Sequence, residues 1–132
     1  MYKKRAALTF VVLAFIVSAC AANKPPSTYT PQITRAYYAD QIDQQLIALS
    51  QSAINLNMAG KLSNTDTIRV RNGVLSIDTA LDSYVSGTET LLAIQAGMNA
   101  WTSTLSSTGS SILAASISLV TVAITTAIAA GA

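Results

Sequence analysis

Residues 31–59 read PQITRAYYADQIDQQLIALSQSAINLNMA, and this stretch decides the fold. Its apolar side chains recur at spacings of three and four, which is the period of one face of an α-helix. The members of the stripe are Ala39, Ile42, Leu46, Leu49, Ala53 and Leu56, with Ile47 and Ile54 widening it. Thr30 is a suitable N-cap, Pro31 suits the first helical position, and Gly60 can end a helix. We therefore predict a helix over residues 31–59.

A second apolar stripe with the same spacing follows the first. It runs through Val70, Val74, Ile77, Leu81, Val85, Thr88, Leu92, Ala96 and Ala100. This predicts a second helix over about residues 66–104, antiparallel to the first, with Gly87 as the most favourable point for a bend. The alternative is a β-hairpin over residues 68–77 around Asn72-Gly73. Because the stripe continues through that turn, the helix is the preferred interpretation.

The C-terminal part of the chain carries no charge. No charged residue occurs in the 43 positions after Glu89, and the last 22 residues read SILAASISLVTVAITTAIAAGA. A helix of this length spans about 33 Å, which matches the hydrocarbon core of a bilayer. We predict a third helix over about residues 110–130. The expected fold is all-α: a helical hairpin plus a Ser/Thr/Ala-rich apolar C-terminal helix, in one small domain over residues 31–132.

Hydroxyl side chains form a narrow stripe on this predicted helix. Its members are Thr104, Ser107, Ser111, Ser118, Thr121 and Thr125. Such a stripe favours close packing against another helix. Three interpretations remain open for the segment: a core helix covered by its neighbours, a helix that enters a membrane or self-associates, and a β-rich tail favoured by its Ile, Val and Thr content.

The first 20 residues have the plan of a secretory signal peptide. A basic stretch at residues 3–5 precedes an apolar run over residues 6–17, which is too short to span a bilayer. The run ends in Val17-Ser18-Ala19-Cys20, whose last residue is the only cysteine of the chain. These four residues resemble the lipobox of bacterial lipoproteins. The resemblance implies cleavage after residue 19, diacylglycerol on the Cys20 sulfur and an acylated amino terminus, which together anchor a chain stably.

Residues 20–30 are a predicted tether. They contain two adjacent prolines and small polar residues, without apolar periodicity, and can reach up to about 30 Å. Ala21 follows Cys20 at a position where, by the same resemblance, an aspartate would favour the inner membrane. The implied location is the periplasmic face of the outer membrane. The alternative is an ordinary signal peptide, or an uncleaved anchor, in which Cys20 is simply buried.

Composition argues against several function classes. Beyond the leader, five scattered basic residues face six acidic ones for a net charge of −1, so nucleic-acid binding is not expected. The chain has no histidine, its one thiol is the predicted lipid site, and its six glycines are far apart. Common nucleophilic catalysis, His-based metal sites and phosphate loops therefore have no basis here. We expect no enzyme activity and no cofactor other than the covalent lipid on Cys20.

Two acidic pairs remain as candidate sites. Asp40 with Asp43, and Asp78 with Asp82, are each placed on one helical face by their spacing, where carboxylates can bind a hard cation or exchange protons. The alternative is a solvated helix surface. Asp66 and Arg69 are expected to form a local ion pair.

These features predict a membrane-anchored lipoprotein that acts by binding, as a structural or accessory subunit of a cell-envelope assembly. Its expected contacts are the bilayer, through Cys20, and a protein partner or further copies of itself. The alternative is a small pore-forming or membrane-perturbing lipoprotein, of a kind that phages or other mobile elements could encode. In that case the C-terminal helix is the inserting element.

Overall fold

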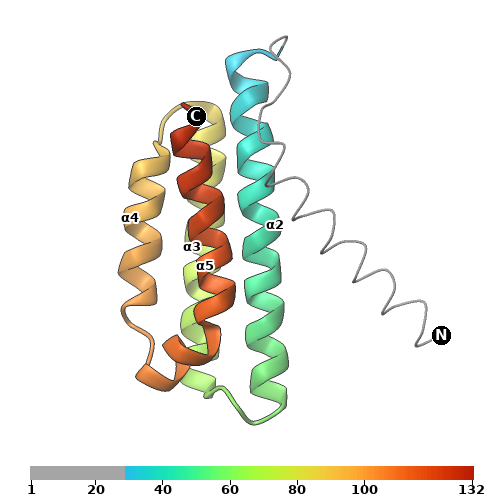
Figure 1. Ribbon diagram of the computed structural model, residues 1–132, viewed down its shortest axis with the longest axis vertical. Helices are drawn as coiled ribbons and strands as arrows, with labels where there is room; N and C mark the ends of the chain where they lie inside the picture. Colours follow the sequence, from blue (N-terminus) through green and yellow to red (C-terminus); the bar gives the residue numbers. More distant parts are fainter. Residues whose placement is uncertain (1–28) are drawn as a thin grey trace, which may run out of the picture.

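The computed structural model describes residues 29–132, and this part of the chain holds four helices and no strand. The helices are α2 (Pro31–Met58), α3 (Asn64–Ser86), α4 (Leu91–Thr102) and α5 (Ser107–Ala129). They alternate in direction, and each contacts two neighbours, in the cyclic order α2, α3, α4, α5 (Figure 1). The predicted signal peptide over residues 1–19, Cys20 and the tether up to residue 28 lie outside the described residues. The all-α prediction is confirmed for residues 29–132.

The start of α2 follows from its capping residues. The Ile33 amide donates to Thr30 Oγ1 at 3.3 Å, and Pro31 occupies the first turn. At the other end Gly60 adopts a φ of 73°, a left-handed conformation that glycine tolerates best. The face turned to the core carries Tyr38, Ala39, Ile42, Gln45, Leu46, Leu49 and Ala53. Most of the stripe predicted from the sequence is therefore the buried face of α2.

The prediction of one helix over residues 66–104 is wrong, and with it the three-helix arrangement. The chain leaves α3 after Ser86, because Gly87 has a φ of 88° and its amide bonds back to Tyr84 O at 3.0 Å. The next helix, α4, starts when Thr90 Oγ1 accepts from the Ala93 amide at 3.2 Å. The apolar stripe crosses this break without a change of spacing because α3 and α4 both face the same core.

The hairpin alternative over residues 68–77 is not found, since these residues all lie within α3. Gly73 has a packing role there. A Cβ added at this position would lie 2.6 Å from Trp101 Cε2 and 2.7 Å from Trp101 Cε3. The absence of a side chain lets the indole of α4 lie directly on the α3 backbone.

The C-terminal segment is helical from Ser107 onward, so the β-rich interpretation is wrong. Its first turn is capped by Ser106, whose Oγ accepts from the Gly109 amide at 3.0 Å. The side chains of Leu113, Val120 and Ile124 are almost completely buried. The segment thus completes the core as the fourth helix of an antiparallel bundle.

Candidate functional site

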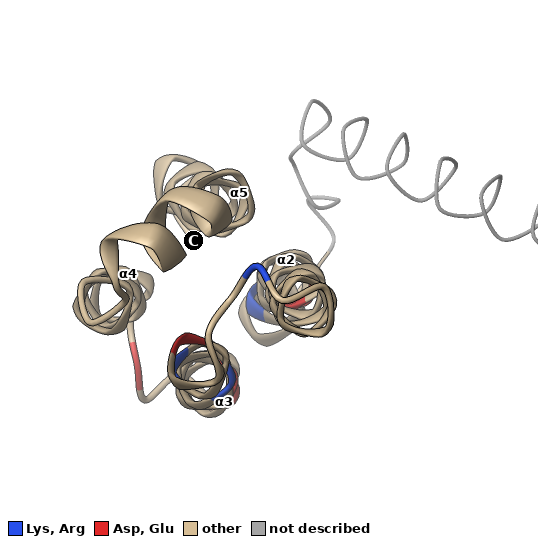
Figure 2. Ribbon diagram, turned by 90° about the horizontal axis from the view of Figure 1, so that it is seen from below, with Lys and Arg blue, Asp and Glu red and all other residues tan. Residues whose placement is uncertain are grey.

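Charge is distributed unevenly over the bundle. Figure 2 shows the basic and acidic residues of the described chain on α2, α3 and the loops that follow them, while α4 and α5 carry none. The last charged residue, Glu89, lies in the loop before α4. The exposed surface of α4 and α5 consequently offers only hydroxyl, amide and apolar groups. We call this surface the uncharged face.

The predicted hydroxyl stripe lies mainly on the uncharged face, with little contact to other helices of the chain. Thr104, Ser107, Ser111, Ser118 and Thr125 are exposed, and Thr121 is half-buried. The contact with another helix involves one member, as Gln95 Nε2 of α4 donates to Thr125 Oγ1 at 3.2 Å. Within residues 29–132 the stripe therefore points outward, on the side of α5 opposite its buried apolar residues.

Large apolar side chains are also exposed on these two helices. They are Leu92 on α4 and Ile112, Leu119 and Val122 on α5, all exposed to solvent. Within the described part of the chain, α5 is the one helix that is long and apolar enough to cross a membrane, and 22% of its most apolar stretch is buried in the bundle. The uncharged face is thus suited by composition to contact protein or lipid.

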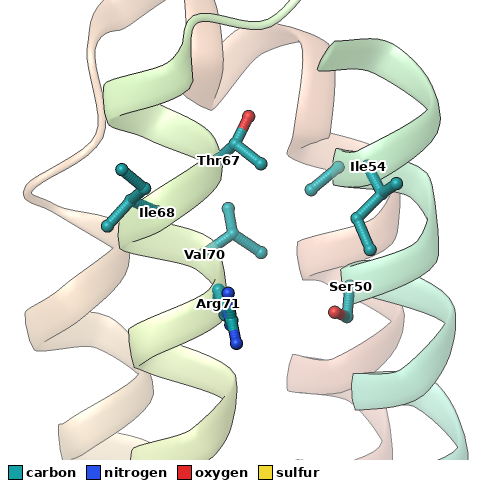
Figure 3. A pocket seen from close by; sticks show the side chains of 7 residues that line it. Ser50, Ile54, Thr67, Ile68, Val70 and Arg71 are labelled. Atoms are coloured by element: carbon teal, nitrogen blue, oxygen red, sulfur yellow. The ribbon is translucent and has the colours of Figure 1, made fainter. Parts of the chain in front are cut away.

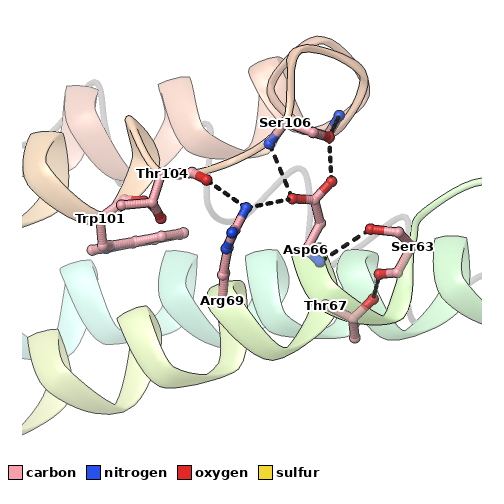
Figure 4. A network of polar contacts seen from close by, with 8 residues as sticks. Ser63, Asp66, Thr67, Arg69, Trp101, Thr104 and Ser106 are labelled. Carbon is pink, nitrogen blue, oxygen red and sulfur yellow. Dashed lines mark hydrogen bonds and ion pairs between the residues drawn. The ribbon is translucent and has the colours of Figure 1, made fainter.

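Asp66 connects the N-termini of α3 and α5. Its carboxylate accepts from the Ser106 amide at 3.0 Å and from the Ser106 hydroxyl, while its own amide donates to Ser63 Oγ at 3.1 Å (Figure 4). A Cβ on Gly109 would lie 2.8 Å from Asp66 Cγ, so only glycine leaves room for this buried carboxylate. The hydrogen bonds from Ser106 lower the pKa of Asp66 although burial opposes them. This cluster fixes the position at which α5 begins.

Arg69 adds a second connection between the same two parts of the chain. The predicted ion pair with Asp66 is present, with Arg69 Nη1 3.7 Å from Asp66 Oδ1. The same nitrogen donates to Thr104 O at 2.6 Å, in the loop between α4 and α5. Sequence reasoning missed Ser106 as the main partner of Asp66, because the two residues are 40 positions apart. One local signal was present in the sequence: Ser106, three residues before Gly109, is a residue type that commonly caps a helix N-terminus.

The structure brings the two acidic pairs together at the seam between α2 and α3. Asp43 lies close to Asp78, and Asp40 and Asp82 are close enough to add repulsion. Partial burial, followed by this contact and the neighbouring charges, raises the pKa of Asp43 to about 6. No group of three or more ligating side chains among residues 29–132 has the geometry to hold a metal ion.

A groove lies on the same seam, nearer to the loop that joins the two helices. Ser50, Ala53 and Ile54 of α2 and Thr67, Ile68, Val70 and Arg71 of α3 line it (Figure 3). Its volume is about 250 Å³, and its walls are mainly apolar. Arg71 is the one cation among these lining residues. The sequence did not single out this groove, because its residues come from two helices and meet only through the packing of α2 against α3.

No protein family, no curated protein and no solved structure matches the chain.

Proposed function

We propose that this chain is a lipid-anchored structural or accessory subunit of a cell-envelope assembly, held through Cys20 on the periplasmic face of the outer membrane. It acts by binding a protein partner, or further copies of itself, with the uncharged face. The single observation that supports this most is that α4 and α5 expose an uncharged surface although they already complete a closed core. Charged residues are also depleted at the centre of protein interfaces.

Burial of the uncharged face has a low electrostatic cost. No charged group would lose its hydration there, a loss that costs several kcal/mol per ion. The hydroxyls of Thr121 and Thr125 already donate to Ile117 O at 3.0 Å and Thr121 O at 2.8 Å. These donors stay satisfied when a partner covers them, and the small side chains permit close helix approach.

A variant of the stripe tests this surface. Ser118→Asp places a charge at the centre of the uncharged face, and Ser76→Asp places the same charge at an exposed position of α3 as a control. We expect Ser118→Asp to reduce the size of the assembly and Ser76→Asp to leave it unchanged, as measured by the sedimentation of the protein in a mild detergent extract. An unchanged profile for Ser118→Asp would exclude the stripe as the interface.

The second candidate function is membrane permeabilisation by α5. Its length and apolar composition favour this candidate. Insertion would require α5 to leave the core with Leu113, Val120 and Ile124, and to break the contacts of Ser106 with Asp66. A bundle that is prevented from opening should therefore lose this activity.

A disulfide between α2 and α5 separates the two functions. Ser52 Oγ and Ser116 Oγ lie 3.5 Å apart, so cysteines at both positions are close enough to be joined with little movement. Ser52→Cys and Ser116→Cys are introduced together into the full chain with Cys20→Ser, and the control carries Ser116→Cys without Ser52→Cys. Dye release from liposomes is measured for both proteins. We expect no release in the oxidised or the reduced state. Release that appears only after reduction would establish the pore and contradict the scaffold.

A further inference from the structure

The outer seam between α2 and α3 is a second apolar surface, on the half of the bundle opposite the uncharged face. Ile47 on α2 is 60% exposed and Leu75 on α3 is 55% exposed. Ile54 lies seven positions after Ile47, and Ile68 lies seven positions before Leu75, so each lies on the same side of its helix and nearer to the loop. Both line the groove of Figure 3. Four large apolar side chains therefore lie in one continuous exposed area.

Opposite charges flank the centre of this area. The register of the two helices places Asp43 next to Asp78, and Ser50 with Arg71 at the groove. Ile47 lies between Asp43 and Ser50 on α2, and Leu75 lies between Arg71 and Asp78 on α3. The seam thus carries one cation on the side of the loop, an apolar centre, and four carboxylates on the other side.

Neither Arg71 nor any of the four carboxylates of the seam forms an ion pair within the described chain. The one ion pair among residues 29–132 joins Arg69 to Asp66, away from the seam. Arg71 donates no hydrogen bond within these residues, and Asp40, Asp78 and Asp82 all repel Asp43. Partial burial, followed by the neighbouring carboxylates, raises the pKa of Asp43. A partner that covers the apolar centre and supplies a cation to the carboxylates fits the surface.

We propose that this partner is a second copy of the chain, bound antiparallel about a two-fold axis that passes close to Ile47 and Leu75. On α3, Arg71 lies about 6 Å before Leu75 along the helix, and Asp78 and Asp82 lie about 4.5 and 10.5 Å after it. Rotation about the axis therefore brings Arg71 of each copy opposite Asp78 and Asp82 of the other. A parallel arrangement would instead place the two acidic clusters against each other.

This inference goes beyond the proposed function, because it requires neither Cys20 nor the uncharged face. The self-complementary pattern makes the contact isologous, as in most symmetric dimers. Its apolar centre buries Ile47 and Leu75, and its charges select the antiparallel orientation.

Charge reversal tests the pairing of Arg71. In the full chain with Cys20→Ser, we compare Arg71→Asp, Asp78→Arg and the double variant by sedimentation equilibrium over a wide concentration range. We expect the single variants to weaken the dimer by about tenfold or more and the double variant to restore it to within about threefold. A protein that is monomeric at all concentrations, or a double variant as weak as the singles, would overturn the inference.

Single cysteines test the position of the axis. Ile47→Cys and Leu75→Cys, each with Cys20→Ser, place the thiol of one copy next to the same thiol of the other copy, so mild oxidation should give disulfide-linked dimers. Met58→Cys is the control, because Met58 is 81% exposed on α2 but lies about 16 Å from Ile47 along the helix. In the antiparallel dimer the two Met58 positions would therefore be about 33 Å apart. Equal linking of the Met58 and Ile47 variants would contradict the antiparallel arrangement.

Discussion

Asp66 is the residue on which the position of the C-terminal half depends most. It is buried, and it accepts two hydrogen bonds from Ser106 while Arg69 approaches from the side. A carboxylate near a helix N-terminus is favourable because the free amides and the helix dipole attract negative charge. Here one carboxylate serves the start of α3 and the start of α5 together.

Replacement of Asp66 should be strongly destabilising. Asp66→Ala leaves the Ser106 amide and hydroxyl without an acceptor, and we expect a loss of about 3 kcal/mol in the free energy of unfolding. Urea denaturation followed by circular dichroism measures it. Ser76→Ala, at an exposed position of the same helix, is the control and should change stability by less than about 0.5 kcal/mol. A loss below about 1 kcal/mol for Asp66→Ala would show that the cluster is dispensable.

Asp43 should have the opposite effect on stability. Its folded pKa of about 6 is above its ordinary value of 3.8, so its ionisation disfavours the folded state, and this cost grows as the pH rises from about 4 to above 6. Asp43→Asn removes the cost, and we expect a gain of about 1 kcal/mol at pH 7.5, because solvent screens this partly exposed group. Thermal unfolding should show no gain near pH 3.5. A gain of equal size at both pH values would contradict this explanation.

The two carboxylates together predict the shape of the pH profile. The pKa of Asp66 is lowered, so its contribution is present above its unfolded pKa and is lost as the pH falls through the folded value. The contribution of Asp43 changes at higher pH and in the other direction. The native chain should gain stability from pH 7.5 to about 5 and lose it in stronger acid. A profile that declines steadily from pH 7.5 downward would be inconsistent with these assignments.

At the scale of elements, two helical glycines provide a matched comparison. Gly73 lies under the Trp101 indole, whereas a Cβ on Gly97 would lie 3.5 Å from Ile77 Cδ1, which is ordinary contact. Gly73→Ala should lower stability by about 1 to 2 kcal/mol, because overpacking outweighs the gain in helix propensity. Gly97→Ala should raise stability by about 0.5 to 1 kcal/mol. Chemical denaturation of both variants measures these shifts, and effects of the same sign would contradict the assigned packing.

Local patterns were sufficient to predict that these segments are helical, but not always to predict where one helix ends and the next begins. The stripe of α2 and the Thr30 and Gly60 signals lie within one element, so its predicted and observed ranges nearly coincide. The sequence predicted a bend at Gly87, and α3 does end there, where Gly87 adopts a positive φ, but nothing in the periodicity indicated that the bend would be a full break between two helices. Periodicity indicates which side of a helix faces the core, but it does not indicate whether the helix is continuous.

Long-range juxtaposition limited the prediction of the candidate site. Each acidic pair was visible from its own spacing, but the contact of Asp43 with Asp78 depends on the register of α2 against α3. The hydroxyl stripe was recognised, but its outward direction became visible only once Leu113, Val120 and Ile124 were placed in the core. Residues that share a site across elements carry no common sequence pattern.

At the scale of the whole molecule, charge divides the bundle into two halves. The α2–α3 half carries the charged residues and the seam proposed for self-association, and the α4–α5 half carries the uncharged face. The start of α2 and the C-terminus lie at the same end of the bundle (Figure 1). Along the chain, this end is the one nearest to Cys20, where the lipid is proposed.

The attachment of lipid to Cys20 is the central claim of this account, and mass spectrometry of the N-terminal peptide from membrane-extracted protein tests it most directly. The account predicts a peptide that begins at Cys20 and carries diacylglycerol on the sulfur and an acyl chain on the amino group. The Cys20→Ser variant should lack both modifications and incorporate no labelled palmitate. A free thiol at position 20, on a chain that still contains residues 1–19 or is recovered from the soluble fraction, would contradict it.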